Sequence, residues 1–272
     1  MQAPAELDLG QVKQLSEPLS MKVLFVAGEV APFSDSTPTS HLMRTLPERL
    51  QEGHGVEPRI IMPRYGVVSE RRNRLHEVIR LSGAEIPVGD QTDTLRVKVA
   101  SIPGIRLQVY FMDSVAFFKR KGLHANRKDD VVFEDNPARA LFLARAALST
   151  ARKLGWTPDI VHAAGWIGSL APHVLRADED LAGVHTVFTP DVVDGFEPVL
   201  TSEDAAALGL PEALGGQTLR MIGLTTADAV AYAPGDGPRD GEPVGPVLDG
   251  DDDAAAERAA ALYETLNPAV AA

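Results

Sequence analysis

The order of hydrophobic patterns between residues 21 and 62 constrains the fold more than any other feature of this sequence. Lys22–Ala27 is a short apolar run that ends at Gly28, as a buried parallel strand does. Apolar residues then recur at helical spacing across Ser40–Leu50, and Glu57–Met62 restores a strand pattern. This strand, helix, strand order predicts a right-handed crossover and a parallel sheet. An α/β fold follows.

Later patterns extend the same architecture. Thr94–Ala100 and Leu107–Met112 flank the Pro103-Gly104 turn, which predicts an antiparallel hairpin. Asn136-Pro137 opens an alanine-rich helix that is expected to run to about Leu154, just before Gly155. Further strands are predicted at 159–162, 185–189 and 230–232, with a helix at 168–176.

Four segments are expected along the 272 residues, which suffice for one large core. Residues 1–20 are predicted to be a flexible leader, and 21–234 to be the folded domain. Residues 235–250 read as an acidic loop rich in glycine and proline. Residues 251–272 begin with acidic side chains and continue with alanines, which predicts a C-terminal helix that docks back on the sheet.

Composition excludes several classes of protein. The chain has no cysteine, so it has neither disulfides nor thiolate metal sites. A formal net charge of −12 argues against nucleic-acid binding, because a phosphate backbone attracts clustered positive charge. The sequence contains no signal-peptide core and no apolar stretch of the roughly 18 residues that a membrane span needs. We therefore expect a soluble cytoplasmic protein with no membrane partner.

The segment from Met21 to Ser34 reads MKVLFVAGEVAPFS, and Ile61 to Gly66 reads IMPRYG. In this order the two segments resemble the opening of bacterial glycogen and starch synthases. Residues 110–113, 158–163 and 223–232 are similar to later landmarks of the same domain, so the resemblance spans roughly 21–234. Residues 62–83 look closer still to a short single-domain form found in Bacteroidetes-type bacteria.

The resemblance implies a Rossmann-like parallel sheet with flanking helices, corresponding to one half of a GT-B glycosyltransferase. In that family two such domains enclose a cleft, the first mainly holding the glucan acceptor and the second most of the nucleotide sugar. The resemblance covers the first domain only. Ligands of open parallel sheets bind at the carboxyl ends of the strands. The crevice inherited from the family is therefore expected to include Glu29, Asp35, Ser36, His162, Trp166 and Asp191.

Three loops of that crevice depart from the family pattern. Where the family carries Lys-Thr-Gly-Gly-Leu, residues 35–39 read Asp-Ser-Thr-Pro-Thr. Exchanging Lys for Asp places a repelled charge near a bound phosphate, at a cost of roughly 3 kcal/mol at ~5 Å in an effective dielectric of about 20. His-Ala-His-Asp-Trp becomes residues 162–166, His-Ala-Ala-Gly-Trp, and Thr-Ile-His-Asn becomes residues 189–192, Thr-Pro-Asp-Val. These changes remove polar groups suited to holding glucose.

No residue is nominated as catalytic, and no cofactor or metal is expected. A divalent metal could bind if Asp35, His41, His162, Asp191 and Asp194 converged, but their spacing matches no known motif. We favour a packed histidine at 162 and solvated loop carboxylates. Trp156 and Trp166 are expected in the core rather than as glucan-stacking platforms. Glu29 and Asp113 match the family pattern and are expected to orient backbone N–H groups.

One basic island interrupts the acidic chain. It comprises Arg64, Arg71, Arg72, Arg74, His76 and Arg80. A helix over this segment would stack residues 72, 76 and 80 on one stripe, which suits an anion or a partner protein. The simpler interpretation, which we favour, is a solvated helix with ion pairs to Glu70 and Glu77.

The favoured function is a glycogen/starch synthase-like single-domain protein without glucosyl transfer that acts as a binding or regulatory module. One alternative is an ADP-glucose-dependent glucan glucosyltransferase that needs a second chain. Another is a carbohydrate-binding module. The corresponding partners are a protein, an anionic small molecule or a glucan.

Overall fold

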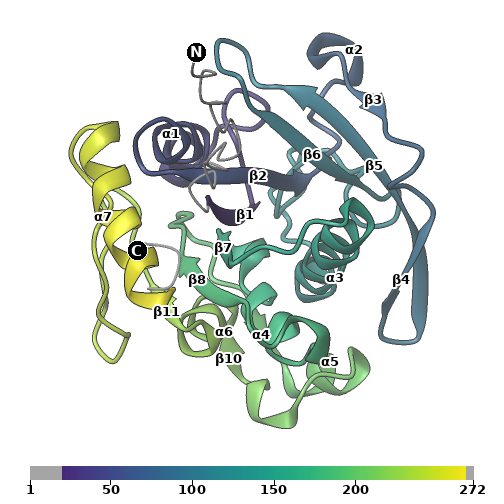
Figure 1. The fold of residues 1–272 in the computed structure, drawn as a ribbon. Coiled ribbons are helices and arrows are strands. Elements are labelled where there is room, and N and C mark those ends of the chain that lie inside the picture. Colours follow the sequence, from purple (N-terminus) through teal and green to yellow (C-terminus); the bar gives the residue numbers. More distant parts are fainter. Residues whose placement is uncertain (1–19, 268–272) are drawn as a thin grey trace, which may run out of the picture.

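The computed structural model describes residues 20–267, which fold around one nine-stranded sheet with helices on both faces (Figure 1). The strand order is β11-β8-β7-β1-β2-β6-β5-β3, and β4 pairs with β5. All pairings from β11 to β6 are parallel, whereas β5 pairs antiparallel with β6, β3 and β4. The strands are β1 (Met21–Ala27), β2 (Val56–Pro63), β3 (His76–Glu77), β4 (Ala84–Val88), β5 (Gln91–Ser101), β6 (Gln108–Asp113), β7 (Ile160–Ala164), β8 (His185–Thr189) and β11 (Ala229–Val230).

Helices cover the two faces of the sheet as separate layers. Figure 1 shows α1 (Pro38–Gly53) and α7 (Asp252–Leu266) side by side on one face. The other face carries α3 (Asn136–Leu154), α4 (Ala171–Arg176) and α6 (Leu219–Thr226). This arrangement confirms the predicted α/β class, a mainly parallel Rossmann-like sheet with flanking helices.

The long helix α3 shows how local sequence sets these elements. Pro137 lies in its first turn, where a missing N–H costs nothing, and Gly155 ends it with a left-handed φ of 61°. Between them the helix buries an alanine- and leucine-rich face that includes Phe142 and Leu148. The sequence prediction for this helix is confirmed.

Smaller elements decorate the edges of the sheet. The predicted hairpin is confirmed as β5 and β6, but its partner β4 was not predicted. The strands β9 (Val199–Leu200) and β10 (Gln217–Thr218) pair in a separate two-stranded sheet, and α5 (Ser202–Ala207) lies between them in the sequence. The single-turn helix α2 (Glu70–Asn73) precedes β3.

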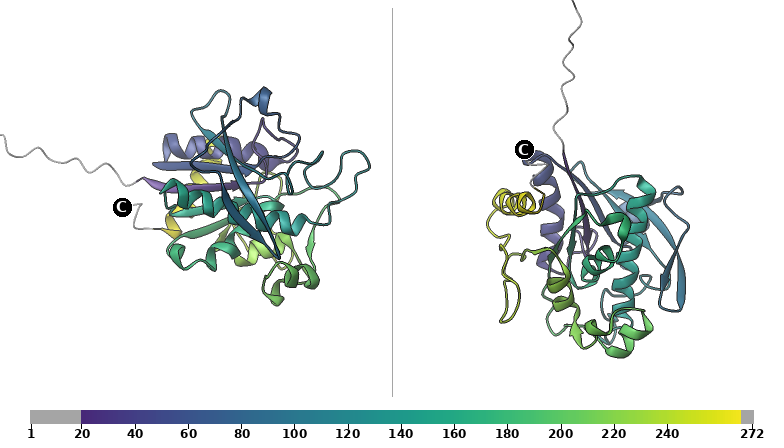
Figure 2. Two further views of the ribbon diagram at one scale, coloured as in Figure 1. Left: turned by 90° about the vertical axis from the view of Figure 1, so that its right-hand side faces the viewer. Right: turned by 60° about the horizontal axis from the view of Figure 1, so that its bottom comes forward.

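The C-terminal segment is part of the folded domain. Figure 2 shows α7, in yellow, against α1, and Tyr263 of α7 is fully buried. The predicted C-terminal helix is found up to Leu266, and residues 1–19 of the predicted leader, residues 1–20, lie outside the described residues. Among the described helices, none has the length and apolar character needed to cross a membrane.

Candidate functional site

The loops that follow the neighbouring strands β1, β7 and β8 lie close together, and the first residue after β1 and after β7 is a glycine. The Gly28 N–H donates to the Ala164 carbonyl at 2.9 Å, and the Gly165 N–H donates to the Thr189 carbonyl at 3.0 Å. Gly165 has a φ of 79°, and a Cβ there would lie 3.0 Å from the Asp191 carboxylate. Glycine thus lets the three loops approach closely, so their polar side chains share one crevice.

Glu29 organises the loop between β1 and α1. Its buried carboxylate accepts hydrogen bonds from the hydroxyl groups of Ser34, Ser36 (2.7 Å) and Thr37 (3.0 Å), and from the Ser36 N–H at 3.2 Å. The expectation that Glu29 orients a backbone N–H is confirmed. The loop is therefore tied to the Glu29 side chain by four hydrogen bonds.

Several backbone donors of this loop are engaged by the loop itself. The N–H groups of Ala31, Phe33 and Ser34 donate to backbone carbonyls, as does that of Ser40 at the start of α1. Pro38 has no N–H to offer. Asp35 is exposed beside the helix start and accepts a hydrogen bond from the Ser40 hydroxyl at 2.6 Å. A phosphate approaching here would meet two carboxylates and would find no N–H at Pro38.

Asp191 follows β8 and faces the same crevice. One carboxylate oxygen accepts a hydrogen bond from the Trp166 N–H at 2.8 Å. Burial raises the pKa of Asp191 to about 7, against the lowering effect of that hydrogen bond, and the nearby Glu29 carboxylate raises it further. This carboxyl group therefore changes charge near neutral pH.

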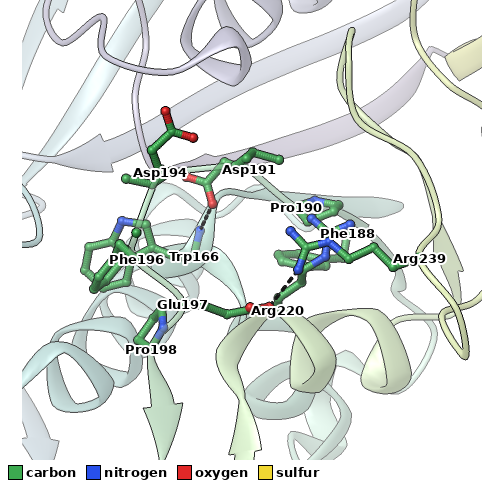
Figure 3. Close-up of a pocket in the computed structure, with 13 residues that line it drawn as sticks. Trp166, Phe188, Pro190, Asp191, Asp194, Phe196, Glu197, Pro198, Arg220 and Arg239 are labelled. Carbon is green, nitrogen blue, oxygen red and sulfur yellow. Dashed lines mark hydrogen bonds and ion pairs between the residues drawn. The ribbon is translucent and has the colours of Figure 1, made fainter.

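A pocket of about 500 Å³ opens beside Asp191, between the 190–198 loop and the C-terminal segment (Figure 3). Trp166 and Phe196 meet edge to face in its wall, with centroids 5.3 Å apart, and His124 stacks on Phe196 at 4.3 Å. The Arg239 guanidinium contacts the Glu197 carboxylate at 2.9 Å. The pocket thus joins an aromatic wall to a set of polar side chains.

Arg220 of α6 anchors the far wall. Its side chain is buried and pairs with Asp236 at 2.8 Å and with Glu242 at 2.7 Å. These ion pairs hold the glycine- and proline-rich segment 235–250 against the domain. Arg220, Arg239, Phe196 and Glu197 were not predicted as site residues. The available signal was an arginine in a helical pattern followed by acids 16 and 22 residues later.

His162 does not belong to the crevice, so its assignment to the crevice is wrong. It lies within β7, has no exposed surface, and contacts the Tyr263 hydroxyl at 2.6 Å and the Thr189 hydroxyl at 2.8 Å. Burial lowers the pKa of His162 to about 3. It is the packed strand-end histidine that the simpler interpretation expected. Both tryptophans are buried as predicted, although Trp166 also lines the pocket.

The basic island does not form a helical stripe. The chain leaves α2 at Arg74, which is left-handed with a φ of 53°, and continues into the edge strand β3. The predicted alignment of Arg72, His76 and Arg80 is therefore wrong. Arg71, Arg72, Arg74, His76 and Arg80 are exposed along this edge.

Arg64 is separate from the other arginines of the island. It is 7% exposed and pairs with Glu70 at 2.5 Å and with Asp113 at 3.3 Å. Asp113 also contacts Lys98 at 2.8 Å, so its role is in an ion-pair network and not in orienting backbone N–H groups. Arg64 is already neutralised, and its assignment to a free anion site is wrong.

The residues of the metal hypothesis are not brought together, since His162 lies in the core and His41 is exposed on α1. Within residues 20–267, no group of three or more histidine, aspartate or glutamate side chains has a metal-binding arrangement.

The fold and the crevice together define a Rossmann-like α/β domain of the kind that forms half of a GT-B glycosyltransferase. The starch synthase catalytic domain model matches residues 22–226, so the chain belongs to that family. The glycogen synthase of Chlorobium luteolum is 40% identical over 172 residues, which cover 62% of this chain and 35% of that protein. The glycogen synthase of Chlorobaculum tepidum is 38% identical over 151 residues, covering 56% and 31%.

A solved structure supports the same fold. The catalytic domain of starch synthase IV from Arabidopsis thaliana, bound to ADP and acarbose, superimposes with a TM-score of 0.63 at 18% identity, covering 78% of this chain and 44% of that one. The chain spans about a third of the length of the curated relatives it matches.

Proposed function

We propose that this domain binds a neutral, hydroxyl-rich ligand, a segment of α-glucan, and does not transfer glucose from ADP-glucose. In this role it is a binding or regulatory module of the glycogen/starch synthase type. The observation that carries the proposal is the loop between β1 and α1, where the family pattern has a lysine and glycines.

Electrostatics of this loop disfavour a sugar nucleotide. Asp35 places a carboxylate at the start of α1, where the family pattern has a lysine, and Asp191 adds a second across the crevice when it is ionised. The Asp35 carboxylate repels a phosphate charge at ~5 Å by roughly 3 kcal/mol in an effective dielectric of about 20. Among the groups that could offset this repulsion, the Ser36 N–H and the hydroxyl groups of Ser36 and Thr37 already donate to Glu29, and Pro38 has no N–H. An uncharged sugar meets no such penalty.

The pocket beside Asp191 has features suited to a sugar. Its volume of about 500 Å³ lies within the range of about 300–1,000 Å³ that is typical of small-molecule sites. Phe196 offers a partly exposed aromatic ring, and Asp191, Asp194 and Glu197 offer oxygen atoms that accept hydrogen bonds from hydroxyl groups.

A second candidate is a working glucosyltransferase that completes its site with another chain. The similarity to glycogen synthases of Chlorobium luteolum and Chlorobaculum tepidum favours it. This candidate requires that the domain accept ADP-glucose, so the two proposals predict opposite results with that ligand.

Calorimetric titration with maltoheptaose and with ADP-glucose tests the proposal. We expect saturable binding of maltoheptaose alone. Phe196→Ala should weaken that binding about tenfold, because one aromatic contact contributes about 0.5–1.5 kcal/mol of binding free energy beyond that of the apolar area it buries. Phe196→Tyr should retain it, and urea unfolding should show that both variants fold. ADP-glucose binding, or maltoheptaose binding that ignores Phe196, contradicts the proposal.

A further inference from the structure

A second pocket, of about 460 Å³, lies between α3, β4 and α4 and shares no residue with the crevice. Figure 1 shows β4 and α4 beside α3, and both contact it. The apolar side chains lining the pocket are Ile86, Pro87, Leu148, Val174 and Leu210. Its polar lining includes two arginines and one histidine, and nothing in the proposed glucan site uses them.

The two arginines differ in whether a nearby carboxylate neutralises their charge. Arg152 is neutralised by the Asp178 carboxylate, which also lines the pocket. Arg145 has no carboxylate within 4.0 Å among the residues that the structure describes. Its Nη1 donates to the Pro87 carbonyl at 2.6 Å, and its other N–H groups have no partner in that same part of the chain. Arg145 therefore brings an uncancelled positive charge to the pocket.

His173 lines the same pocket as a neutral imidazole near neutral pH, so it does not add to the charge of Arg145. It is half-buried on α4, and burial lowers its pKa, with the Arg176 and Arg145 guanidinium groups lowering it further. Glu85, the other carboxylate of the pocket wall, is exposed and accepts a hydrogen bond from Thr94 at 2.7 Å. Burial also lowers the pKa of Arg145, so its charge lacks full solvation.

We propose that this pocket is a binding site for a small organic carboxylate with a short hydrocarbon body. The planar guanidinium of Arg145 presents paired donors that match a carboxylate. The apolar lining contacts the hydrocarbon part, whose burial contributes about 25 cal/mol per Å². A single uncancelled guanidinium suits one negative charge and not a polyphosphate.

Titration with hexanoate, followed by the chemical shifts of the protein and by calorimetry, tests the proposal. We expect saturable binding of hexanoate and none of 1-hexanol, which has the same hydrocarbon body without the charge. Arg145→Gln should weaken hexanoate binding at least about tenfold, because a hydrogen bond to a charged group contributes about 1.5–3 kcal/mol. Arg145→Lys keeps the positive charge but loses the paired donors of the guanidinium. Its affinity for hexanoate should lie between those of the parent and of Arg145→Gln.

Arg106→Gln is the matched control, since Arg106 is an exposed arginine on the β5–β6 turn and does not line the pocket. It should bind hexanoate as the parent does, and urea unfolding of each variant checks that the fold is intact. Failure of the parent to bind hexanoate overturns the proposal. The proposal is also overturned if folded Arg145→Gln binds hexanoate as tightly as the parent does, or if the parent binds 1-hexanol as tightly as hexanoate. Binding of inorganic phosphate in place of hexanoate overturns it too.

Discussion

Asp191 couples the crevice to pH at the scale of one residue. Its folded-state pKa of about 7 lies above the ordinary value of 3.8, so between these values the folded protein holds the proton more tightly than the unfolded chain does. This contribution to stability is fully present below about pH 4 and is lost as the pH rises through 7.

We predict that Asp191→Asn makes the protein more stable than the parent at pH 8, by up to about 4 kcal/mol, since one pKa unit corresponds to about 1.4 kcal/mol. At pH 4 the two proteins should have equal stability, because both side chains are then neutral. The amide oxygen of asparagine can still accept the hydrogen bond from Trp166. Urea unfolding at both pH values measures the difference. An equal difference at pH 4 and pH 8 would count against the pKa assignment.

Sequence reasoning located some site residues and missed the cause of their behaviour. Glu29 and Asp191 were predicted because they occupy loops after strand patterns. The raised pKa of Asp191 could not be predicted, since it depends on burial against Gly165 and on the distance to Glu29. Arg220 was missed because its carboxylates lie in a segment that reads as a loop.

At the scale of elements, the buried ion pairs of Arg220 fasten the segment 235–250 to α6. We predict that Arg220→Met destabilises the protein by about 3–5 kcal/mol, because it leaves the largely buried Asp236 and Glu242 carboxylates without the guanidinium that neutralises them. Hydrogen exchange of amides in residues 235–250 should accelerate more than exchange in α3. Uniform acceleration across both regions would show that the ion pairs stabilise the whole fold and not this segment.

The hydrogen bond between Tyr263 and His162 links α7 to the sheet. Tyr263→Phe should cost about 1–3 kcal/mol in the free energy of unfolding, because the buried His162 Nδ1 loses its partner. Tyr110 is a partly exposed tyrosine whose hydroxyl has no hydrogen bond within the described residues, so Tyr110→Phe is the control and should change stability by less than about 0.5 kcal/mol. Equal effects of the two substitutions would contradict the assigned role.

Elements were predictable where one hydrophobic period dominated. The strands β1, β7 and β8 and the helix α3 have clear apolar patterns, and their positions were predicted to within a few residues. Residues 70–80 carry charges at four-residue spacing but bury no helical stripe, and Arg74 turns the chain out of α2. Charge spacing alone therefore predicted a helix that tertiary structure does not support.

At the scale of the whole molecule, the account separates fold from activity. The match of the starch synthase catalytic domain model to residues 22–226 places the chain in that family, as the resemblance in sequence predicted, and the parallel sheet agrees with it. The charge and hydrogen bonding of the loop between β1 and α1 support the proposed loss of glucosyl transfer. That loop is short enough to be moved into a complete relative.

The most direct test replaces the positions that correspond to residues 35–39 in the full-length glycogen synthase of Chlorobium luteolum with Asp-Ser-Thr-Pro-Thr. The account predicts that kcat/KM for glucose transfer falls by about 100-fold or more, because roughly 3 kcal/mol of charge repulsion corresponds to two factors of ten. Exchange of a distant turn, matching residues 103–106 here, should leave the rate unchanged. A loop chimera whose rate stays within about threefold of its parent would contradict the account.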